Sequence, residues 1–506
     1  MKRGQDPVLR PNVGVMRIPK NKWFWFGGTL ACLVFVCLFM IRLDVFDKFL
    51  YRPKALAIPT VGLPQAKETW MNIFQGNRKI GFSHTRLSVE QDGYQLQETV
   101  RMRINTMGMV QDIQLKTRGR LKKDYSLADF DFDINSGRFG FHVDGSLSGD
   151  VLTINTASAG AKRRMEIRLD NKPYLLAGIT AAMAAVELKA GDRYAFHIFD
   201  PATMGQTPVT AEIIGREDIA VAGRQIPATK VALNFKGTSQ TAWIDEAGDV
   251  VQEKGLLGIR LEKTTRHDIR AGLGRQASAD LTEIASVASN VKLESPDQLA
   301  SLKFEIDGIA NMKLSLKGGR QAYKNKVLTV SRESTADLAD HIHPNDLEIL
   351  QKIYLKPSAF VQSDHQKIQS LAHEIVADKS TSLEKVQALV DWVYHNIEKR
   401  PVLSLPDALS TLENRVGDCN EHAVLFAALA RAAGIPCRLE AGLVYLKGRF
   451  YYHAWNLVYL GRWITVDALF AQIPADVSHI RLVSGSPRQQ LDLMGLIGNI
   501  KLKVIQ

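Results

Sequence analysis

One short stretch constrains the fold of this chain more than any other: Gly417-Asp418-Cys419, followed at once by an apolar helical pattern that ends near Ala433. Asp418 has the short acceptor side chain that is favoured at a helix N-cap, and Gly434 is the glycine expected just past a helix end. The pattern therefore predicts a helix whose first turn contains Cys419. At that place the free backbone N–H groups and the positive end of the helix dipole favour a thiolate over a thiol.

The sequence after this helix predicts three strands, at 437–446, 450–458 and 463–466. If the last hairpin has a three-residue loop that ends at a left-handed Gly461, Val458 pairs with Arg462. Continuing this register places His453 directly opposite Asp467 on one face, where their Cβ atoms lie about 4.5–5.5 Å apart. An aspartate at that position can hold the imidazole ring in one tautomer.

A cysteine, a histidine and an aspartate in this order are the parts of a thiol nucleophile, its base and the group that orients the base. Each alone has a plainer interpretation, because a cysteine at a helix start or a histidine in a strand is more often structural. Together they favour a catalytic site of Cys419, His453 and Asp467 that attacks an amide carbonyl and passes through a thioester. An amine acceptor then gives transamidation and water gives hydrolysis, with no metal and no cofactor required.

The same segments resemble the transglutaminase-like superfamily, in its bacterial branch. The resemblance extends over about Pro344 to Gln506, and its motifs are Gly417-Asp418-Cys419, 431–436, His453-Ala454-Trp455 and 463–467. It implies a papain-like α/β core in which Cys419, His453 and Asp467 are the catalytic triad. It also implies protein or peptide substrates, with a protease-like role as plausible as crosslinking.

Four further residues are candidates for supporting roles around this site. His422 lies three residues after Cys419 on the same helical face, where it supports the helix or contacts the thiolate. Trp455 shares a strand face with the histidine, so it either shields the site from water or only packs. The backbone N–H of Cys419 is the natural donor to an oxyanion, and Trp392 or Tyr394 on the preceding helix is a candidate second donor.

The N-terminal end has the pattern of a membrane anchor. Residues 1–22 hold six basic residues against one acidic residue, and Trp23 to Ile41 is a run of 19 residues without charge. Such a run can span a hydrocarbon layer of about 30 Å, and the basic arm is expected to stay cytoplasmic. The sequence therefore predicts a single-pass membrane protein whose bulk is periplasmic or extracellular. A cleaved signal peptide is the rival interpretation, but no small-x-small cleavage site follows the run.

The chain as a whole is predicted to be a multidomain α+β protein. After the arm 1–22 and the transmembrane helix 23–41, its predicted parts are a stalk 42–69, a β-rich domain 70–270, a linker 271–283, a small β module 284–335 and the catalytic domain 336–506. The long β-rich region keeps a second hypothesis open, namely a catalytically silent scaffold or binding protein of the cell envelope. That region is then the surface for an unknown envelope partner.

Net charge, cysteine positions and the spacing of acidic residues exclude several other functions. The net charge is +11, but much of it belongs to the N-terminal arm and no basic stripe is interleaved with aromatic residues, so nucleic-acid binding is not expected. Of the four cysteines, Cys32 and Cys37 fall in the apolar run, and both Cys419 and Cys437 are expected to be free. The acidic run 129–133 lacks the glycine and glutamate of a calcium loop and is expected to be a strand.

Overall fold

A computed structural model describes residues 66–505 except 138, 159–160, 185, 236, 271–278, 310–311, 337, 339–343, 403–404 and 486–490. The predicted arm 1–22, the apolar run Trp23–Ile41 with Cys32 and Cys37, and most of the stalk 42–69 and of the linker 271–283 lie outside the described residues. The chain divides into two units, 1–54 and 55–506, and every described residue belongs to the second. Within the described part of the chain, no helix combines the length and the apolar character needed to cross a membrane.

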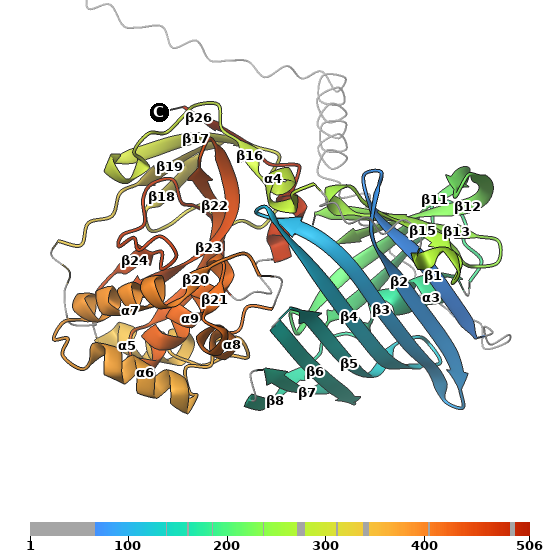
Figure 1. The fold of residues 1–506 in the computed structure, drawn as a ribbon, viewed down its shortest axis with the longest axis horizontal. Helices are drawn as coiled ribbons and strands as arrows, with labels where there is room; N and C mark the ends of the chain where they lie inside the picture. The colour runs from blue at the N-terminus through green and yellow to red at the C-terminus, as the bar shows by residue number, and fades with distance from the viewer. Residues whose placement is uncertain are drawn as a thin grey trace, which may run out of the picture. The chain divides into compact units, whose positions relative to one another are not determined.

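The first half of the described chain forms one fifteen-stranded sheet, which confirms its predicted β-rich character (Figure 1). Its strands are β1 (Lys67–Gln75), β2 (Arg78–Glu90), β3 (Gly93–Thr106), β4 (Met109–Lys122), β5 (Leu127–Ser136), β6 (Phe139–Ser148), β7 (Val151–Ser158), β8 (Ala161–Arg168), β9 (Pro173–Tyr174), β10 (Arg193–Asp200), β11 (Gly205–Val221), β12 (Arg224–Phe235), β13 (Thr238–Asp245), β14 (Val250–Lys254) and β15 (Ile259–Thr264). The order runs from β8 down to β1 and then from β15 down to β9.

Two antiparallel meanders are thus joined where the first strand, β1, pairs with the last, β15. The helix α3 (Leu176–Ala184) connects β9 to β10, which pair in parallel, and its Ile179 and Met183 are buried in a core with residues of β10 to β13. Alternation along each strand sends one set of side chains toward such cores and the other set toward water. The acidic run predicted to be a strand lies in β5.

The C-terminal part is an α/β unit whose helices cover one face of a five-stranded sheet (Figure 1). The helices are α5 (Pro344–Tyr354), α6 (Gln366–Val376), α7 (Ser382–Asn396), α8 (Ala408–Asn414) and α9 (Cys419–Ala432). The sheet has the order β16 (Val287–Ala288), β23 (Arg449–Tyr459), β22 (Cys437–Leu446), β25 (Ile480–Ser484), with β24 (Trp463–Val466) paired to β23. A short parallel pair, β20 (Glu398–Lys399) and β21 (Val416–Gly417), leads into α9.

Helix α9 is the centre of this unit, because every residue from Glu421 to Ala430 is buried. It contacts β22, β23, α6, α7 and α8. The apolar faces of α6 and α7 pack against it, with Ile368 of α6 and Leu389 of α7 fully buried in the shared core. A helix buried all round is held in place by its neighbours, so its N-terminus is fixed relative to the sheet.

The segment predicted as a separate small β module, 284–335, is part of this C-terminal unit. Its strands are β17 (Ser301–Asp307), β18 (Gln321–Lys324) and β19 (Val327–Ser331), and β17 pairs with β26 (Lys501–Val504) at the C-terminal end of the chain. The helix α4 (Leu281–Ala285), capped by Asp280, precedes it. These strands pack on residues 441–445 of β22 and 450–452 of β23, in a core that holds Phe304 and Phe450, whereas the helices pack on residues nearer the other ends of the two strands. Long-range pairing of this kind leaves no local signal in a sequence.

Candidate active site

The N-terminus of α9 is built by the residues around Cys419. The Asp418 side chain accepts a hydrogen bond from the Asn420 backbone N–H at 3.0 Å, and the Glu421 side chain accepts one from the Asp418 N–H at 3.0 Å. This is the predicted N-cap, extended to a reciprocal capping box. Gly417 is required there, because a Cβ atom on it would lie 2.2 Å from Cβ of Glu421. The Gly-Asp-Cys motif is thus a helix start that fixes the position of the cysteine.

Cys419 is the first residue of α9 and is partly exposed. The backbone N–H of Ala454, the residue after His453 on β23, donates a hydrogen bond to its sulfur. Burial nevertheless raises the pKa of the Cys419 thiol well above its usual range, and the charge of Asp418 adds to this effect. The carboxylates that build the helix cap thus act against the helix dipole, which the sequence predicts to favour a thiolate.

His453 lies on β23 with its side chain buried, and its Nε2 atom is 2.6 Å from Oδ2 of Asp467. A carboxylate only accepts, so Nε2 carries the proton and Nδ1 keeps its lone pair. The pairing is close to the predicted one, but the predicted register is wrong by two residues. Val458 pairs with Ile464, not with Arg462. Because a shift of two residues keeps every side chain on the same face, the two residues still meet, along a diagonal.

The carboxylate of Asp467 is surrounded by donors. Oδ2 accepts from His453 and, at 2.9 Å, from Nε2 of His479, while Oδ1 accepts the backbone N–H groups of Leu469 and Phe470 at 2.8 and 3.1 Å. Burial opposes ionisation, but the interactions with His453 and His479 outweigh it and hold the pKa of Asp467 far below its usual range. Asp467 therefore stays ionised and fixes the orientation of the His453 ring.

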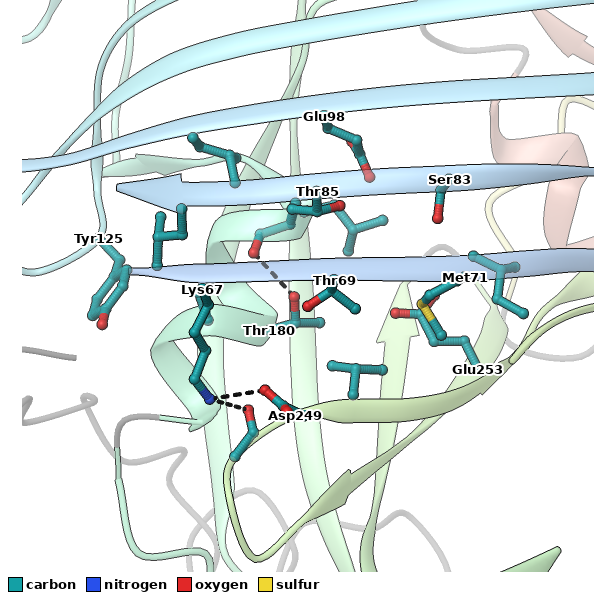
Figure 2. Close-up of a pocket in the computed structure, with 18 residues that line it drawn as sticks. Lys67, Thr69, Met71, Ser83, Thr85, Glu98, Tyr125, Thr180, Asp249 and Glu253 are labelled. Atoms are coloured by element: carbon teal, nitrogen blue, oxygen red, sulfur yellow. Dashed lines mark hydrogen bonds and ion pairs between the residues drawn. The ribbon is translucent and has the colours of Figure 1, made fainter. Parts of the chain in front are cut away.

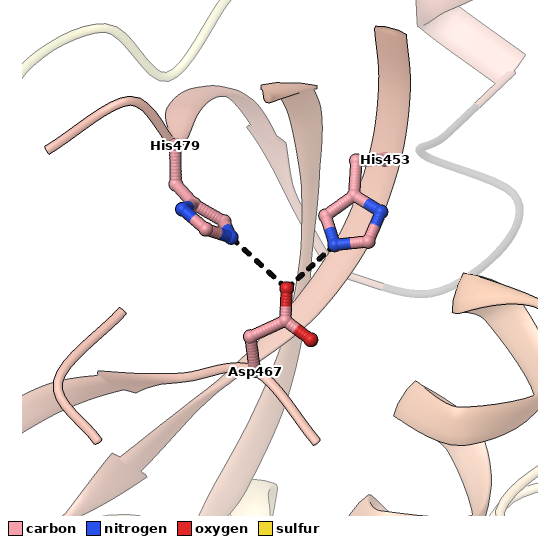
Figure 3. Close-up of side chains that lie close together, drawn as sticks. All are labelled: His453, Asp467 and His479. Carbon is pink, nitrogen blue, oxygen red and sulfur yellow. Dashed lines mark hydrogen bonds and ion pairs between the residues drawn. The ribbon is translucent and has the colours of Figure 1, made fainter. Parts of the chain in front are cut away.

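His479 completes this cluster and was not singled out in the sequence (Figure 3). It is fully buried just before β25, with Nε2 toward Asp467 and Nδ1 3.1 Å from Oδ1 of Asp476. Burial lowers the pKa of His479, but its hydrogen bonds to Asp467 and Asp476 outweigh this and raise the pKa above its usual value. Both ring nitrogens face carboxylates, so both must donate and the ring is an imidazolium.

The one sequence signal for this histidine is a glycine inside the neighbouring strand. Gly442 of β22 pairs with both His453 and Arg481. A Cβ atom at Gly442 would lie 1.9 Å from the carbonyl oxygen of Ile480, the residue after His479. Glycine inside a strand often marks such a close approach of backbones. Here it allows β25 to come near enough for His479 to reach Asp467.

Aromatic rings hold the His453 ring on both sides. Phe470 is stacked on it with ring centroids 5.1 Å apart and planes inclined by 20°, and Trp455 is stacked at 6.0 Å and 26°. Trp455 is 1% exposed and also meets His479 edge-on at 5.3 Å. The structure thus places Trp455 where it both packs and keeps water from the buried histidines.

The other predicted supporting residues lie around the cysteine helix without converging on the sulfur. His422 is buried, and its Nδ1 lies 2.7 Å from the carbonyl oxygen of Asp418. Burial lowers its pKa, so it is neutral and donates through Nδ1. The Trp392 ring lies against the guanidinium of Arg415 at 4.6 Å, and the Tyr394 ring lies against the Lys399 ammonium at 3.4 Å.

Among the described residues, two groups of side chains have the composition of a metal site. His453, Asp467 and His479 form one, but their contacts of 2.6 and 2.9 Å converge on a single oxygen atom and have the lengths of hydrogen bonds. The second group, Asp131, Asp133 and His142, is partly buried on β5 and β6, and Nδ1 of His142 lies 3.0 Å from Asp133. Hydrogen bonds account for both arrangements.

Residues 369–468, which contain Cys419, His453 and Asp467, match the family described as Transglutaminase-like superfamily. Kyphoscoliosis peptidase of Mus musculus is 31% identical over 145 residues, covering 25% of this chain and 21% of that protein. The Homo sapiens protein of the same name is 30% identical over 156 residues, covering 25% and 23%. This chain therefore spans less than a quarter of the length of the curated relatives it matches.

Two solved structures are similar over parts of the chain. The periplasmic domain of TgpA from Pseudomonas aeruginosa is 21% identical, with 29% of this chain and 54% of that chain covered and a TM-score of 0.22. A β-barrel-like protein of a domain family of unknown function from Brucella abortus is 9% identical, with 40% and 96% covered and a TM-score of 0.32. The match to the superfamily is the specific result: residues 369–468 of this chain form a transglutaminase-like domain.

Proposed function

We propose that the protein is a cysteine acyl-transfer enzyme that acts on amide bonds of protein or peptide substrates, with Cys419, His453 and Asp467 as its catalytic triad. The observation that carries the proposal is the hydrogen bond from Nε2 of His453 to Asp467. It leaves Nδ1 as the free base of the ring, beside the strand residue Ala454 whose N–H holds the cysteine sulfur. The two relatives named as peptidases also support a reaction at amide bonds.

The reaction begins from a neutral thiol. His453 takes the proton of Cys419 on Nδ1 as the sulfur attacks the carbonyl carbon of the amide, and the negative charge develops on the carbonyl oxygen. Collapse of this intermediate breaks the C–N bond, and the imidazolium gives its proton to the leaving amine. Water or a second amine then attacks the thioester, with His453 again as the base, and releases the acid or the new amide.

The charges around His453 fit the role of a base. Asp467 is ionised and stabilises the imidazolium that forms during the reaction. His479, whose ring centroid lies 5.7 Å from that of His453, shares the Oδ2 atom of Asp467 with it. Proton transfer from the thiol to His453 accompanies bond formation with the substrate.

We also infer that the catalytic part is held at a membrane, by the run Trp23–Ile41, with its bulk on the periplasmic or extracellular side. The support is the length of the uncharged run and the basic arm before it. Protease treatment of intact cells or spheroplasts, followed by detection of both chain ends, tests this placement.

The alternative function is a silent scaffold or binding protein of the cell envelope that keeps the fold without turnover. The raised pKa of Cys419 favours it, because an inert thiol has the same property. Alkylation by iodoacetamide separates the two functions when a substrate-like peptide amide is added. In the enzyme, Cys419 reacts with the amide and is protected from alkylation. In a scaffold, the amide has no effect on the alkylation rate.

The decisive experiment is capture of the thioester. The protein is incubated with a library of peptide amides, quenched in acid and analysed by mass spectrometry, and hydroxylamine is added in a parallel sample to collect hydroxamates. An acyl adduct on Cys419 that is absent in Cys419→Ser is expected. Cys437→Ser is the matched control, because Cys437 is free and fully buried in β22, where burial raises its pKa to about 12. Adducts that persist in Cys419→Ser would contradict the proposal.

A further inference from the structure

The fifteen-stranded sheet encloses a cavity of about 170 Å³ that is separate from the cysteine site (Figure 2). Alternate residues of β1, β2 and β3 form one wall, β14 and β15 form another, and α3 contributes Leu176, Ala177, Thr180 and Ala181. The volume is comparable to the cavity of about 150 Å³ that accommodates benzene in a well-studied protein. A ligand of the size of one long side chain fits this space.

The wall of this cavity is unusual because its inward residues are polar where an apolar core is expected. Thr69 of β1 pairs with Thr85 of β2, and Thr85 pairs with Glu98 of β3. One cross-strand row thus presents two hydroxyl groups and a carboxyl group to the interior, and Ser83 lies in the next row beside Met71. Polar side chains that line a partly enclosed space are the usual mark of a binding site.

Two carboxyl groups share the cavity without a cation. Burial raises the pKa of Glu98, and burial together with the charge of Glu98 raises the pKa of Glu253 to about 7. The single side-chain donor to Glu253 among the described residues is Gln240, through Nε2 at 3.2 Å. Within the described part of the chain, neither carboxylate forms an ion pair. Two half-buried carboxylates that share one cavity are costly to ionise together unless a positive charge joins them.

The remaining titratable groups of the lining do not supply that charge. The Lys67 ammonium lies 3.1 Å from Asp249 and donates to the backbone oxygens of Ala247 and Gly248, so it is already neutralised at the edge of the cavity (Figure 2). Tyr125, which also lines the cavity, is fully buried and its ring is stacked on that of Tyr94 at 4.5 Å. Its hydroxyl meets no hydrogen-bond criterion among the described residues, and burial together with Tyr94 raises its pKa. A buried hydroxyl without a well-placed acceptor or donor is a second sign that the lining can take a polar ligand.

We propose that this cavity binds a primary ammonium group carried on an aliphatic chain. An ammonium has three donors, and the lining of the cavity offers it acceptors in Glu98, Glu253 and the hydroxyl groups of the polar row. Leu87, Leu96 and Leu261 line the same cavity and accommodate the methylene groups. A divalent metal ion fits less well, because neither glutamate belongs to a group of three potential ligands among the described residues.

The same chemistry is present in a small free amine and in the side chain of a lysine within a polypeptide. Calorimetric titration of the full chain at pH 7.5 with butylamine and with Nα-acetyl-lysine-N-methylamide distinguishes the two sources. Binding of both compounds means that the ammonium chain alone is recognised. Binding of butylamine alone identifies a small free amine as the ligand, and binding of the lysine derivative alone identifies a lysine side chain. Neutral butanol is expected not to bind. Failure of both amines to bind, or equal binding of butanol, overturns the proposal.

Two variants test whether Glu98 and Glu253 bind the ammonium group. Glu98→Gln and Glu253→Gln are expected to weaken amine binding at least tenfold each and to fold normally, since each removes a buried charge. The matched control is Glu246→Gln, an exposed glutamate paired with Arg216 on the surface, which is expected to bind as the unaltered chain does. Amine binding that is unchanged in both cavity variants, or displaced by Ca²⁺, contradicts the assignment. Cys419→Ser is expected to bind the amine normally, so the result is independent of the proposed catalytic function.

Discussion

His453 and Asp467 are joined by a hydrogen bond of 2.6 Å although they are not partners across the hairpin of β23 and β24. The last paired residue before the aspartate is Val466, and Asp467 itself exchanges two backbone hydrogen bonds of 3.0 Å with Gln472. The turn that follows supplies the backbone N–H groups that hold Oδ1. The aspartate is thus positioned by its turn, and its other oxygen is left to select the tautomer of the histidine.

The first prediction follows from this selection. Asp467→Asn is expected to lower kcat/KM for a peptide amide by about 10³–10⁴-fold, because the neutral amide no longer stabilises the imidazolium or fixes its tautomer. The measurement is steady-state kinetics, with circular dichroism to verify the fold. Asp476→Asn is the control, since Asp476 contacts His479 but not His453. An equal loss in both variants would point to general destabilisation of the turn.

The second prediction concerns His479 as a positioning residue. His479→Gln removes a positive charge whose ring centroid lies 5.7 Å from that of His453. Asp467 then loses one of the two histidines that hold its pKa far below the usual range, so its pKa rises and the acidic limb of the pH–rate profile is expected to move upward. His479→Lys, which restores a charge, is expected to bring the limb back at least in part. A purely structural role would lower the rate at every pH without moving the limb.

The third prediction concerns the close approach of β22 and β25. Gly442→Ala places a Cβ atom 1.9 Å from the Ile480 carbonyl oxygen, so β25 must move and His479 moves with it. The expected loss of unfolding free energy is about 1–3 kcal/mol, together with a loss of activity. Denaturant titration measures the loss of unfolding free energy. The control is Gly255→Ala, where the nearest atom would be 4.0 Å away and little change is expected.

The sequence predicted the local elements of the site well. The strands 437–446 and 463–466 have the predicted bounds, and the helix begins at Cys419 behind its Asp418 cap. These features depend on caps, glycines and alternation within a few residues of one another. The hairpin register was wrong because Gly461, left-handed as predicted, lies in the middle of the loop, while Tyr459 and Trp463 pair and pack their rings edge-on at 5.4 Å.

The features that the sequence did not reveal are long-range. His479 lies in a turn without periodicity, and its role arises only when β25 is placed beside β22. The pairing of β1 with β15 and of β17 with β26 joins segments far apart in the chain, so their patterns are those of ordinary strands. Burial, which also comes from tertiary structure, raises the pKa of the Cys419 thiol against the local effect of the helix dipole.

The last prediction concerns the stability of the β-rich sheet as a function of pH. The pKa of Glu253 is raised from 4.5 to about 7 in the folded state, so between these values the unfolded chain releases a proton that the folded chain retains. The unfolding free energy contributed by this group is therefore full below about pH 4.5 and falls as the pH rises through 7, by about 3 kcal/mol in total. In Glu253→Gln this fall is expected to disappear, and the variant is expected to be more stable than the unaltered chain at pH 8. Urea titrations at pH 5 and pH 8 measure both effects, and Glu246→Gln is the control. A variant that is less stable at pH 8 would mean that the Glu253 carboxylate is already stabilised in the folded chain, which contradicts an unpaired charge in the cavity.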